Sequence, residues 1–239
     1  MRKDIVVLRT PVKMVAAALA AGAVLTACGS GQVKLGAATL MTNDRISAST
    51  LSAHVANLNK WYEKYKGQIQ LRYPVSQMPQ EVLSWLIRFK VGDQMAVRNG
   101  ITVTPGQQQA ELKAINDSAK SSTTTGAPVP LKALAVENGL PPDMLGDLAR
   151  YQAIQTMLVN RLDGGKDPGT PSGRQAIANE FNGYQCRAAK SLDIRVSPQF
   201  GQLDYTQISV VPLPSTLAAD PGPTPSPSPS STVQLTPHC

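Results

Sequence analysis

Residues 81–99 have the sequence EVLSWLIRFKVGDQMAVRN, which is rich in apolar side chains and contains no proline. In the first half of this segment the apolar residues point in nearly every direction around an α-helix. A helix that is apolar on most of its surface is normally central and covered by other elements. Gly100 follows at the place where a glycine commonly ends a helix. We therefore expect a helical protein built around this segment.

A second helix with one apolar face is expected before this central one. Its apolar residues recur at spacings of four, three, four and three, the pattern of one helix face: Leu51, Val55, Leu58, Tyr62 and Tyr65. Serine is a common N-cap residue, so the helix is expected to begin near Ser47 or Ser49. A polar loop that contains Pro74 and Pro79 is expected to follow it.

Four more helices are expected after Gly100. Thr104, Pro105 and Gln107 fit the N-cap, N1 and N3 positions of a capping box, which predicts a helix as far as about Lys120. Few of its residues are apolar, so we expect it to be exposed. The other three helices are expected over residues 131–138, 142–162 and 172–190. In the 142–162 helix, the residues expected to face inward are Leu145, Leu148, Tyr151, Leu158 and Leu162.

A short strand is expected near the end of the globular region. Leu192, Ile194 and Val196 alternate with Asp193 and Arg195, which is typical of a half-buried strand. A plausible partner strand is residues 37–41. The predicted fold class is mainly α: a helical domain with a small two-stranded sheet that joins its N- and C-terminal ends.

The first 27 residues are predicted to be a lipoprotein signal peptide. Basic residues precede an apolar run at residues 14–24, which is long enough for a signal peptide but too short to span a membrane. The run ends in Leu25-Thr26-Ala27-Cys28, which matches the lipobox of bacterial lipoproteins. In such proteins the cysteine is lipidated and the chain is cut before it. We expect an extracytoplasmic protein anchored to the cell membrane through lipid on Cys28. The alternative is an ordinary signal peptide with a chance cysteine.

The composition of the chain indicates which partners and which further segments to expect. Removing residues 1–27 takes away four of the 23 basic side chains and one of the 16 acidic ones, which lowers the net charge from +7 to +4. An exported chain with this charge is not expected to bind nucleic acid. Residues 28–36 are expected to form a flexible tether, residues 37–211 the globular domain, and residues 212–239, rich in proline and serine, a disordered tail.

The cysteine count predicts one possible disulfide. If lipid occupies Cys28, two cysteines remain, Cys186 and Cys239. A pair of cysteines outside the cytoplasm usually oxidises. The alternatives are a buried Cys186 with a free terminal thiol, or a bridge between two chains through Cys239.

Catalytic and metal-binding patterns are weak in this sequence. His54 lacks an accompanying Ser or Cys motif, so we expect a helix-surface histidine and not a general base. Asp143 and Asp147 are expected to complement a helix dipole as first-turn acids. Gly164-Gly165-Lys166 lacks the strand and helix of a phosphate loop. We expect no enzyme activity, no metal, no cofactor and no nucleotide.

Four segments in order resemble the N-terminal domain of the SurA and PrsA type of extracytoplasmic chaperone. Residues 37–47 (AATLMTNDRIS) resemble its opening strand, turn and helix start. Residues 82–105 (VLSWLIRFKVGDQMAVRNGITVTP) are similar to its "VLxxLI … GIxVTxxE" segment, and Asn138-Gly139-Leu140 matches the next one. Residues 193–204 (DIRVSPQFGQLD) resemble its closing strand and turn, although Gln202 and Leu203 replace a small residue and a tryptophan.

The resemblance implies a chaperone domain without its isomerase. Full-length relatives insert a parvulin isomerase domain of about a hundred residues before the closing strand, whereas this chain has only a loop and one helix there. The implied function is a membrane-anchored protein that holds unfolded exported polypeptides without prolyl isomerase activity. An aromatic client-binding patch is suggested by Trp61, Tyr62, Tyr65 and Trp85, although Tyr62 and Tyr65 also fit the core stripe. The alternative is a structural or adaptor lipoprotein that binds one specific envelope partner.

Overall fold

The computed structural model of the protein describes residues 36–121, 129–164 and 166–213. The predicted signal peptide, residues 28–35 of the predicted tether and residues 214–239 of the predicted tail lie outside the described residues, as do Cys28 and Cys239. The elements follow in the order β1 (Ala37–Leu40), β2 (Arg45–Ser47), α1 (Ala48–Tyr65), η1 (Val75–Gln77), α2 (Met78–Arg98), α3 (Pro105–Ser121), α4 (Leu131–Glu137), η2 (Pro142–Met144), α5 (Leu145–Leu162), α6 (Pro171–Ser191), β3 (Arg195–Val196), β4 (Gln202–Asp204) and β5 (Ser209–Val211).

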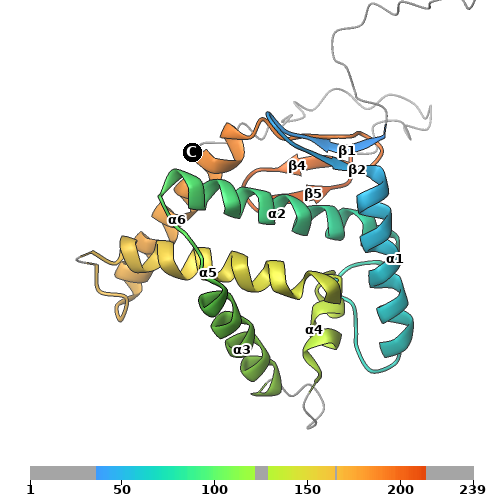
Figure 1. Ribbon diagram of the computed structural model, residues 1–239, viewed down its shortest axis with the longest axis horizontal. Coiled ribbons are helices and arrows are strands. Elements are labelled where there is room, and N and C mark those ends of the chain that lie inside the picture. The colour runs from blue at the N-terminus through green and yellow to red at the C-terminus, as the bar shows by residue number, and fades with distance from the viewer. Residues whose placement is uncertain (1–35, 122–128, 165, 214–239) are drawn as a thin grey trace, which may run out of the picture. The chain divides into compact units, whose positions relative to one another are not determined.

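Helix α2 is the central element, as its sequence predicts. It contacts α1, α5, α6 and β5, with the strands on one side of it and α5 on the other (Figure 1). One row of its side chains is fully buried along four successive turns: Leu83, Ile87, Val91 and Met95. The helix begins at Met78, so the prediction that Pro79 lies in a loop was wrong. A proline fits the first turn because the N–H it lacks has no intrahelical partner there.

The predicted helix caps of α1 and α3 are confirmed. Ser47 is the N-cap of α1, where its Oγ accepts a hydrogen bond from the Thr50 N–H at 3.0 Å. At α3 the Gln107 N–H donates to Thr104 Oγ1 at 3.3 Å, and the Thr104 N–H donates to Gln107 Oε1 at 2.8 Å. These reciprocal bonds are the capping box that the sequence predicts, since each side chain satisfies a backbone donor that the helix leaves free.

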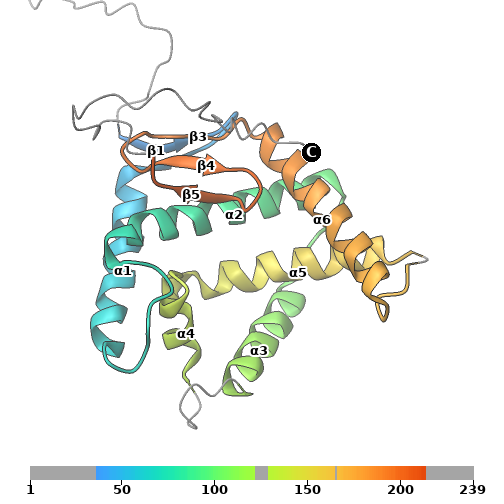
Figure 2. The same ribbon diagram turned by 180° about the vertical axis from the view of Figure 1, so that it is seen from behind.

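Helices α3, α4 and α5 lie on the side of α2 that faces away from the sheets (Figure 2). Gly139 ends α4 with a φ of +73°, as the sequence suggests, in a region that favours glycine. Tyr151, Leu158 and Leu162 of α5 are buried as expected. Leu145 and Leu148 are half-buried and also face inward, where they pack against a smaller buried cluster that contains Leu140 and Met144.

The fold class is confirmed: the protein is mainly helical, and a small antiparallel sheet joins the two ends of the domain. Strand β1 pairs with β3, with Thr39 opposite Val196. The sheet has a third strand, β2, on the other side of β1. Strands β4 and β5 form a separate antiparallel hairpin that was not predicted. Strand β3 is shorter than expected because Leu192 caps α6 and Asp193 has a φ of +44°.

The β4–β5 hairpin is fixed to α2 by two polar side chains. Ser84 is 1% exposed, and its Oγ accepts a hydrogen bond from the Val210 N–H at 2.8 Å while donating to the Gln80 carbonyl at 2.7 Å. Arg88 Nε donates to the Ile208 carbonyl at 3.1 Å. Ser84 and Arg88 of the central helix α2 therefore hold the β4–β5 hairpin in place.

Gly201, between β3 and β4, is a position that only glycine fits well. Its φ is +122°, in the region that L side chains rarely adopt. A Cβ at this position would lie 2.2 Å from the Val211 carbonyl oxygen. The close approach lets the chain turn directly into the hairpin.

Among residues 36–121, 129–164 and 166–213, no helix combines the length and the apolar character needed to cross a bilayer.

Candidate functional site

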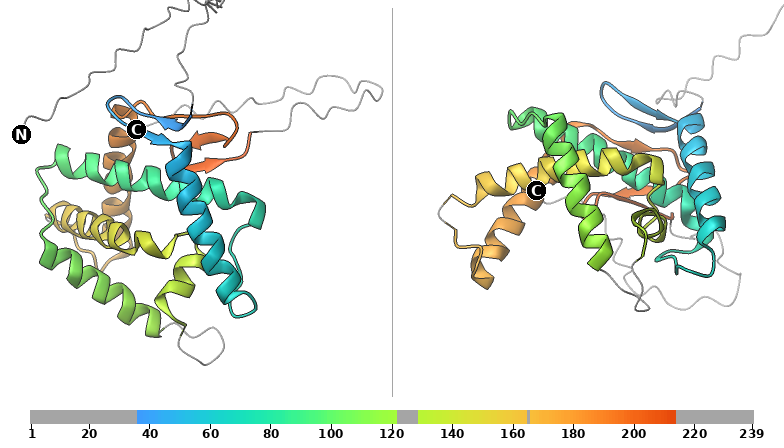
Figure 3. Two further views of the ribbon diagram at one scale, coloured as in Figure 1. Left: turned by 45° about the vertical axis from the view of Figure 1, so that its right-hand side comes forward. Right: turned by 60° about the horizontal axis from the view of Figure 1, so that its bottom comes forward.

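An apolar groove of about 830 Å³ lies where α3, α4 and the end of α1 meet. Figure 3 shows α3 and α4 on the same side of α5. The apolar lining comes from four elements and the segment before α4: Tyr65, Leu112, Val129, Pro130, Leu131 and Leu145. The volume lies within the ~300–1,000 Å³ range of ligand-binding pockets.

A second apolar cavity of about 300 Å³ continues from this groove. Leu131 and Leu145 line both cavities. Trp85 from α2 lines the inner one, together with Ile115 from α3. The shared leucines make the two cavities neighbouring parts of one apolar surface, which extends from the end of α1 to the centre of the domain.

The structure brings together some of the predicted client-binding aromatic residues. Tyr65 lines the groove and Trp85 lines the inner cavity. Trp61 stacks on Tyr65, with ring centroids 5.9 Å apart and ring planes inclined at 18°, so it lies at the edge of the groove. Tyr62 lines neither cavity and packs against the hydrophobic core, so the structure does not place it with the others.

Helix α3 has an apolar face that lines the two cavities, although its composition predicts an exposed helix. Leu112 faces the groove, Ile115 faces the inner cavity, and Ala119 is buried and lines the inner cavity. Gln108 donates to the Gly146 carbonyl at 2.9 Å, which joins α3 to α5. The spacing of these four residues is four, three and four, a narrow helical stripe that could have identified the buried face.

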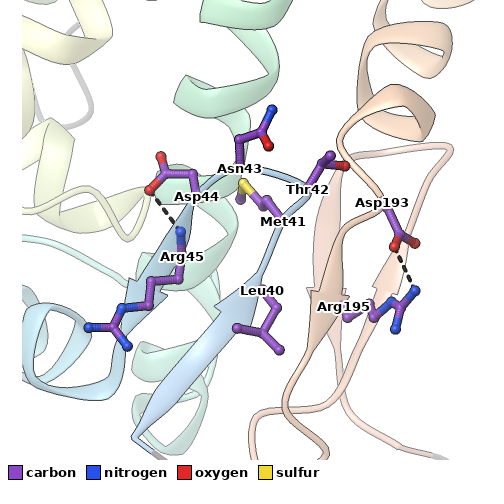
Figure 4. Close-up of a pocket in the computed structure, with 8 residues that line it drawn as sticks. All are labelled: Leu40, Met41, Thr42, Asn43, Asp44, Arg45, Asp193 and Arg195. Atoms are coloured by element: carbon purple, nitrogen blue, oxygen red, sulfur yellow. Dashed lines mark hydrogen bonds and ion pairs between the residues drawn. The ribbon is translucent and has the colours of Figure 1, made fainter. Parts of the chain in front are cut away.

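A polar hollow of about 570 Å³ lies at the opposite side of the domain, where the β1–β2 turn meets the start of β3 (Figure 4). Its two carboxylates already have partners. Asp44 accepts from the Arg45 N–H at 2.7 Å and pairs with Lys90 at 2.6 Å, and Asp193 pairs with Arg195 at 2.6 Å. The hollow is therefore best explained as the junction of the two chain ends.

The ion pair in this junction predicts a pH-dependent contribution to stability. The hydrogen bond from Lys90 lowers the pKa of Asp44 from its ordinary value of 3.8. A lowered folded-state pKa stabilises the fold above the unfolded value, and this stability disappears as the pH falls through the folded value. Asp44→Asn is expected to reduce the free energy of unfolding by about 0.2–1 kcal/mol at neutral pH, the range of exposed ion pairs.

Urea denaturation of both proteins across a pH series measures this difference. The two stability curves should converge as the pH falls through the lowered pKa of Asp44, because protonation removes the pair, and also in ~1 M salt, because screening weakens it. An Asp44→Asn difference that persists unchanged at low pH and high salt would contradict the ion-pair explanation.

His54 is half-buried and lies beside an acidic residue. Its Nδ1 is 3.3 Å from Asp143 Oδ2, and this nitrogen is buried without a hydrogen bond. Asp147 lies in the first turn of α5, as expected. Burial raises the pKa of Asp147, and the charge of Asp93 adds to the effect. The His54–Asp143 contact links α1 to η2, the short helix before α5. Among the described residues, no group of three or more His, Cys, Asp and Glu could hold a metal ion.

Cys186, on α6, is disulfide-bonded. The other two cysteines of the sequence, Cys28 and Cys239, lie outside the described residues. The bridge between Cys186 and Cys239 therefore stays a prediction.

Comparison with known proteins adds no relative. No protein-family model, curated protein or solved structure matches the chain. The likeness to the SurA and PrsA type of chaperone domain thus rests on residues 37–47, 82–105, 138–140 and 193–204 alone.

Proposed function

We propose that the protein is a membrane-anchored, extracytoplasmic chaperone-like lipoprotein that binds unfolded exported polypeptides. The observation that carries the proposal is the pair of neighbouring apolar cavities between α3, α4 and α5, which share Leu131 and Leu145. An unfolded chain exposes apolar side chains, which gain free energy when they leave water. The groove offers them leucine, valine and aromatic contacts of low sequence specificity.

The chemistry of the groove suits weak and reversible holding. A fully buried leucine side chain contributes ~1.5–3 kcal/mol, and ordering an extended segment offsets part of this gain. Binding of this kind reverses without nucleotide hydrolysis. The proposal therefore includes neither a nucleotide nor an isomerase step.

The proposed anchor is lipid on Cys28. It is supported by the order of basic residues, apolar run and lipobox in residues 1–28. More than one acyl chain gives stable attachment, since a single chain binds a membrane only marginally. Attachment would concentrate the groove near polypeptides that emerge from the membrane.

The proposal is tested by suppression of aggregation with several unrelated client proteins. Leu112→Gln places a polar group in the groove wall, and it is expected to weaken client binding up to about tenfold because a buried leucine contact is lost. Val97→Gln is the matched control, since Val97 is 76% exposed on α2 and lines neither cavity. Light scattering reports aggregation, and circular dichroism checks that both variants are folded.

The adaptor alternative gives a different result in the same assay. An adaptor would leave unrelated clients to aggregate and would bind one envelope protein at fixed stoichiometry. Equal suppression by wild type and Leu112→Gln would show that the groove is not the client site.

A further inference from the structure

The charged side chains that line the groove all have the same sign. They are Lys113 and Lys120 from α3 and Lys132 from α4, and none of the described residues that line the groove is acidic. Ammonium groups from α3 and from α4 therefore border the apolar floor of the groove. A neutral apolar segment would bring no counter-charge to these ammonium groups.

Two of the three lysines already share one carboxylate. Asp117, one turn from each along α3, lies 2.6 Å from Lys113 Nζ and 3.2 Å from Lys120 Nζ. Lys113, Lys120 and Asp117 together therefore carry one net positive charge. Nearby acids are also engaged: Glu63 pairs with Lys66, and Glu137 pairs with Arg72.

Lys132 and Lys64 lie at the aromatic end of the groove. Lys132 Nζ is 4.8 Å from the Trp61 ring centroid, and Lys64 Nζ is 4.6 Å from it. The indole therefore has two ammonium groups within cation–π distance. A carboxylate placed beside Trp61 would meet both charges while its neighbouring residues enter the groove past Tyr65.

We propose that the groove selects extended polypeptide segments in which acidic residues alternate with apolar ones. Alternate side chains of an extended segment point to opposite sides, so one set can contact the leucine floor while the other meets the lysines. This inference rests on the proposed function, because it names the class of client segment that the groove prefers. A segment with lysine in place of glutamate meets like charges and should bind more weakly.

The test compares three short peptides with the same leucines, separated by glutamate, glutamine or lysine. Fluorescence anisotropy of labelled peptides measures their binding to the full chain in ~20 mM and ~1 M salt, because screening separates the charge effect from the apolar one. The double variant Lys64→Gln/Lys132→Gln removes the two charges beside Trp61. Lys90→Gln is the control, since Lys90 pairs with Asp44 in the polar hollow and lines neither cavity.

At low salt the glutamate peptide is expected to bind more tightly than the glutamine peptide. Lys64 and Lys132 should each contribute about a two- to fivefold difference in Kd, the range that exposed ion pairs give. High salt should remove this preference, and the double variant should reduce it, because Lys113 and Lys120 still line the groove. Lys90→Gln should leave the preference unchanged. The glutamine peptide should bind the double variant as it binds wild type.

The possible failures are distinguishable. Equal binding of all three peptides would overturn the acidic preference and leave the chaperone proposal standing. If none of the three peptides binds, both the acidic preference and the chaperone proposal are wrong. Anionic lipid vesicles are titrated in parallel, and vesicle binding that needs Lys64 and Lys132, without any preference among the peptides, would assign the lysines to a membrane surface instead.

Discussion

Ile87→Ala is expected to lower the free energy of unfolding by about 2–5 kcal/mol, the cost of removing a large buried aliphatic side chain and leaving a cavity. Ile87 lies at the middle of α2 and is 0% exposed. Both neighbours on its row, Leu83 and Val91, are equally buried, so few groups can move into the space. A loss of this size is a large part of the ~5–15 kcal/mol that stabilises a typical domain.

Urea denaturation monitored by circular dichroism measures the effect. Val97→Ala on the same helix is the matched control, because Val97 is 76% exposed and such changes usually stay within about 0.5 kcal/mol. Similar losses in Ile87→Ala and Val97→Ala would contradict the central position of α2.

Ser84→Ala is expected to cost about 1–3 kcal/mol, because it leaves a buried N–H without a partner. The donor is the Val210 amide, which reaches Ser84 Oγ at 2.8 Å across 126 residues of sequence. The effect should be concentrated in the β4–β5 hairpin, since the hydroxyl joins this hairpin to α2. Arg88, which binds the Ile208 carbonyl, should keep the hairpin partly in place.

Hydrogen exchange distinguishes this local effect from general destabilisation. The Val210 amide should lose protection in Ser84→Ala by more than the amides at the centre of α2. Ser52→Ala, an exposed serine on α1, is the control and should leave both stability and exchange unchanged. Unaltered protection of Val210 would mean that Ser84 does not hold the hairpin.

Local sequence patterns predicted the helices and their ends well. Ser47, Thr104 and Gln107 cap their helices through bonds within three residues, so the neighbouring sequence contains all that is needed. Gly100 and Gly139 end helices at positive φ for the same local reason. The pairing of β1 with β3 was also predicted, because Ile194 and Val196 alternate with charged residues and the two segments lie at opposite ends of one domain.

The unpredicted features depend on contacts between distant segments. Strands β4 and β5 have three residues each, too few to show a clear alternation, and β5 is buried through its contact with α2. Ser84 appears in the sequence as an isolated polar residue, and only the fold shows its partner. The sequence did not predict the groove, because Leu112 lies in a polar helix and Leu131 in a short one. The predicted client-binding residues were instead aromatic. Of those, Tyr65 belongs to the buried core, and Tyr62 is partly buried against it.

Site-specific photo-crosslinking tests the central claim, that the groove between α3 and α4 binds unfolded exported polypeptides. A photoreactive residue replaces Leu112 in the groove wall or, as a control, the exposed Val97, in the full chain in its native envelope. The account predicts crosslinks from position 112 to many exported proteins of different sizes, fewer when export is blocked, and almost none from position 97. A single crosslinked partner at position 112, or equal crosslinking from both positions, would contradict it.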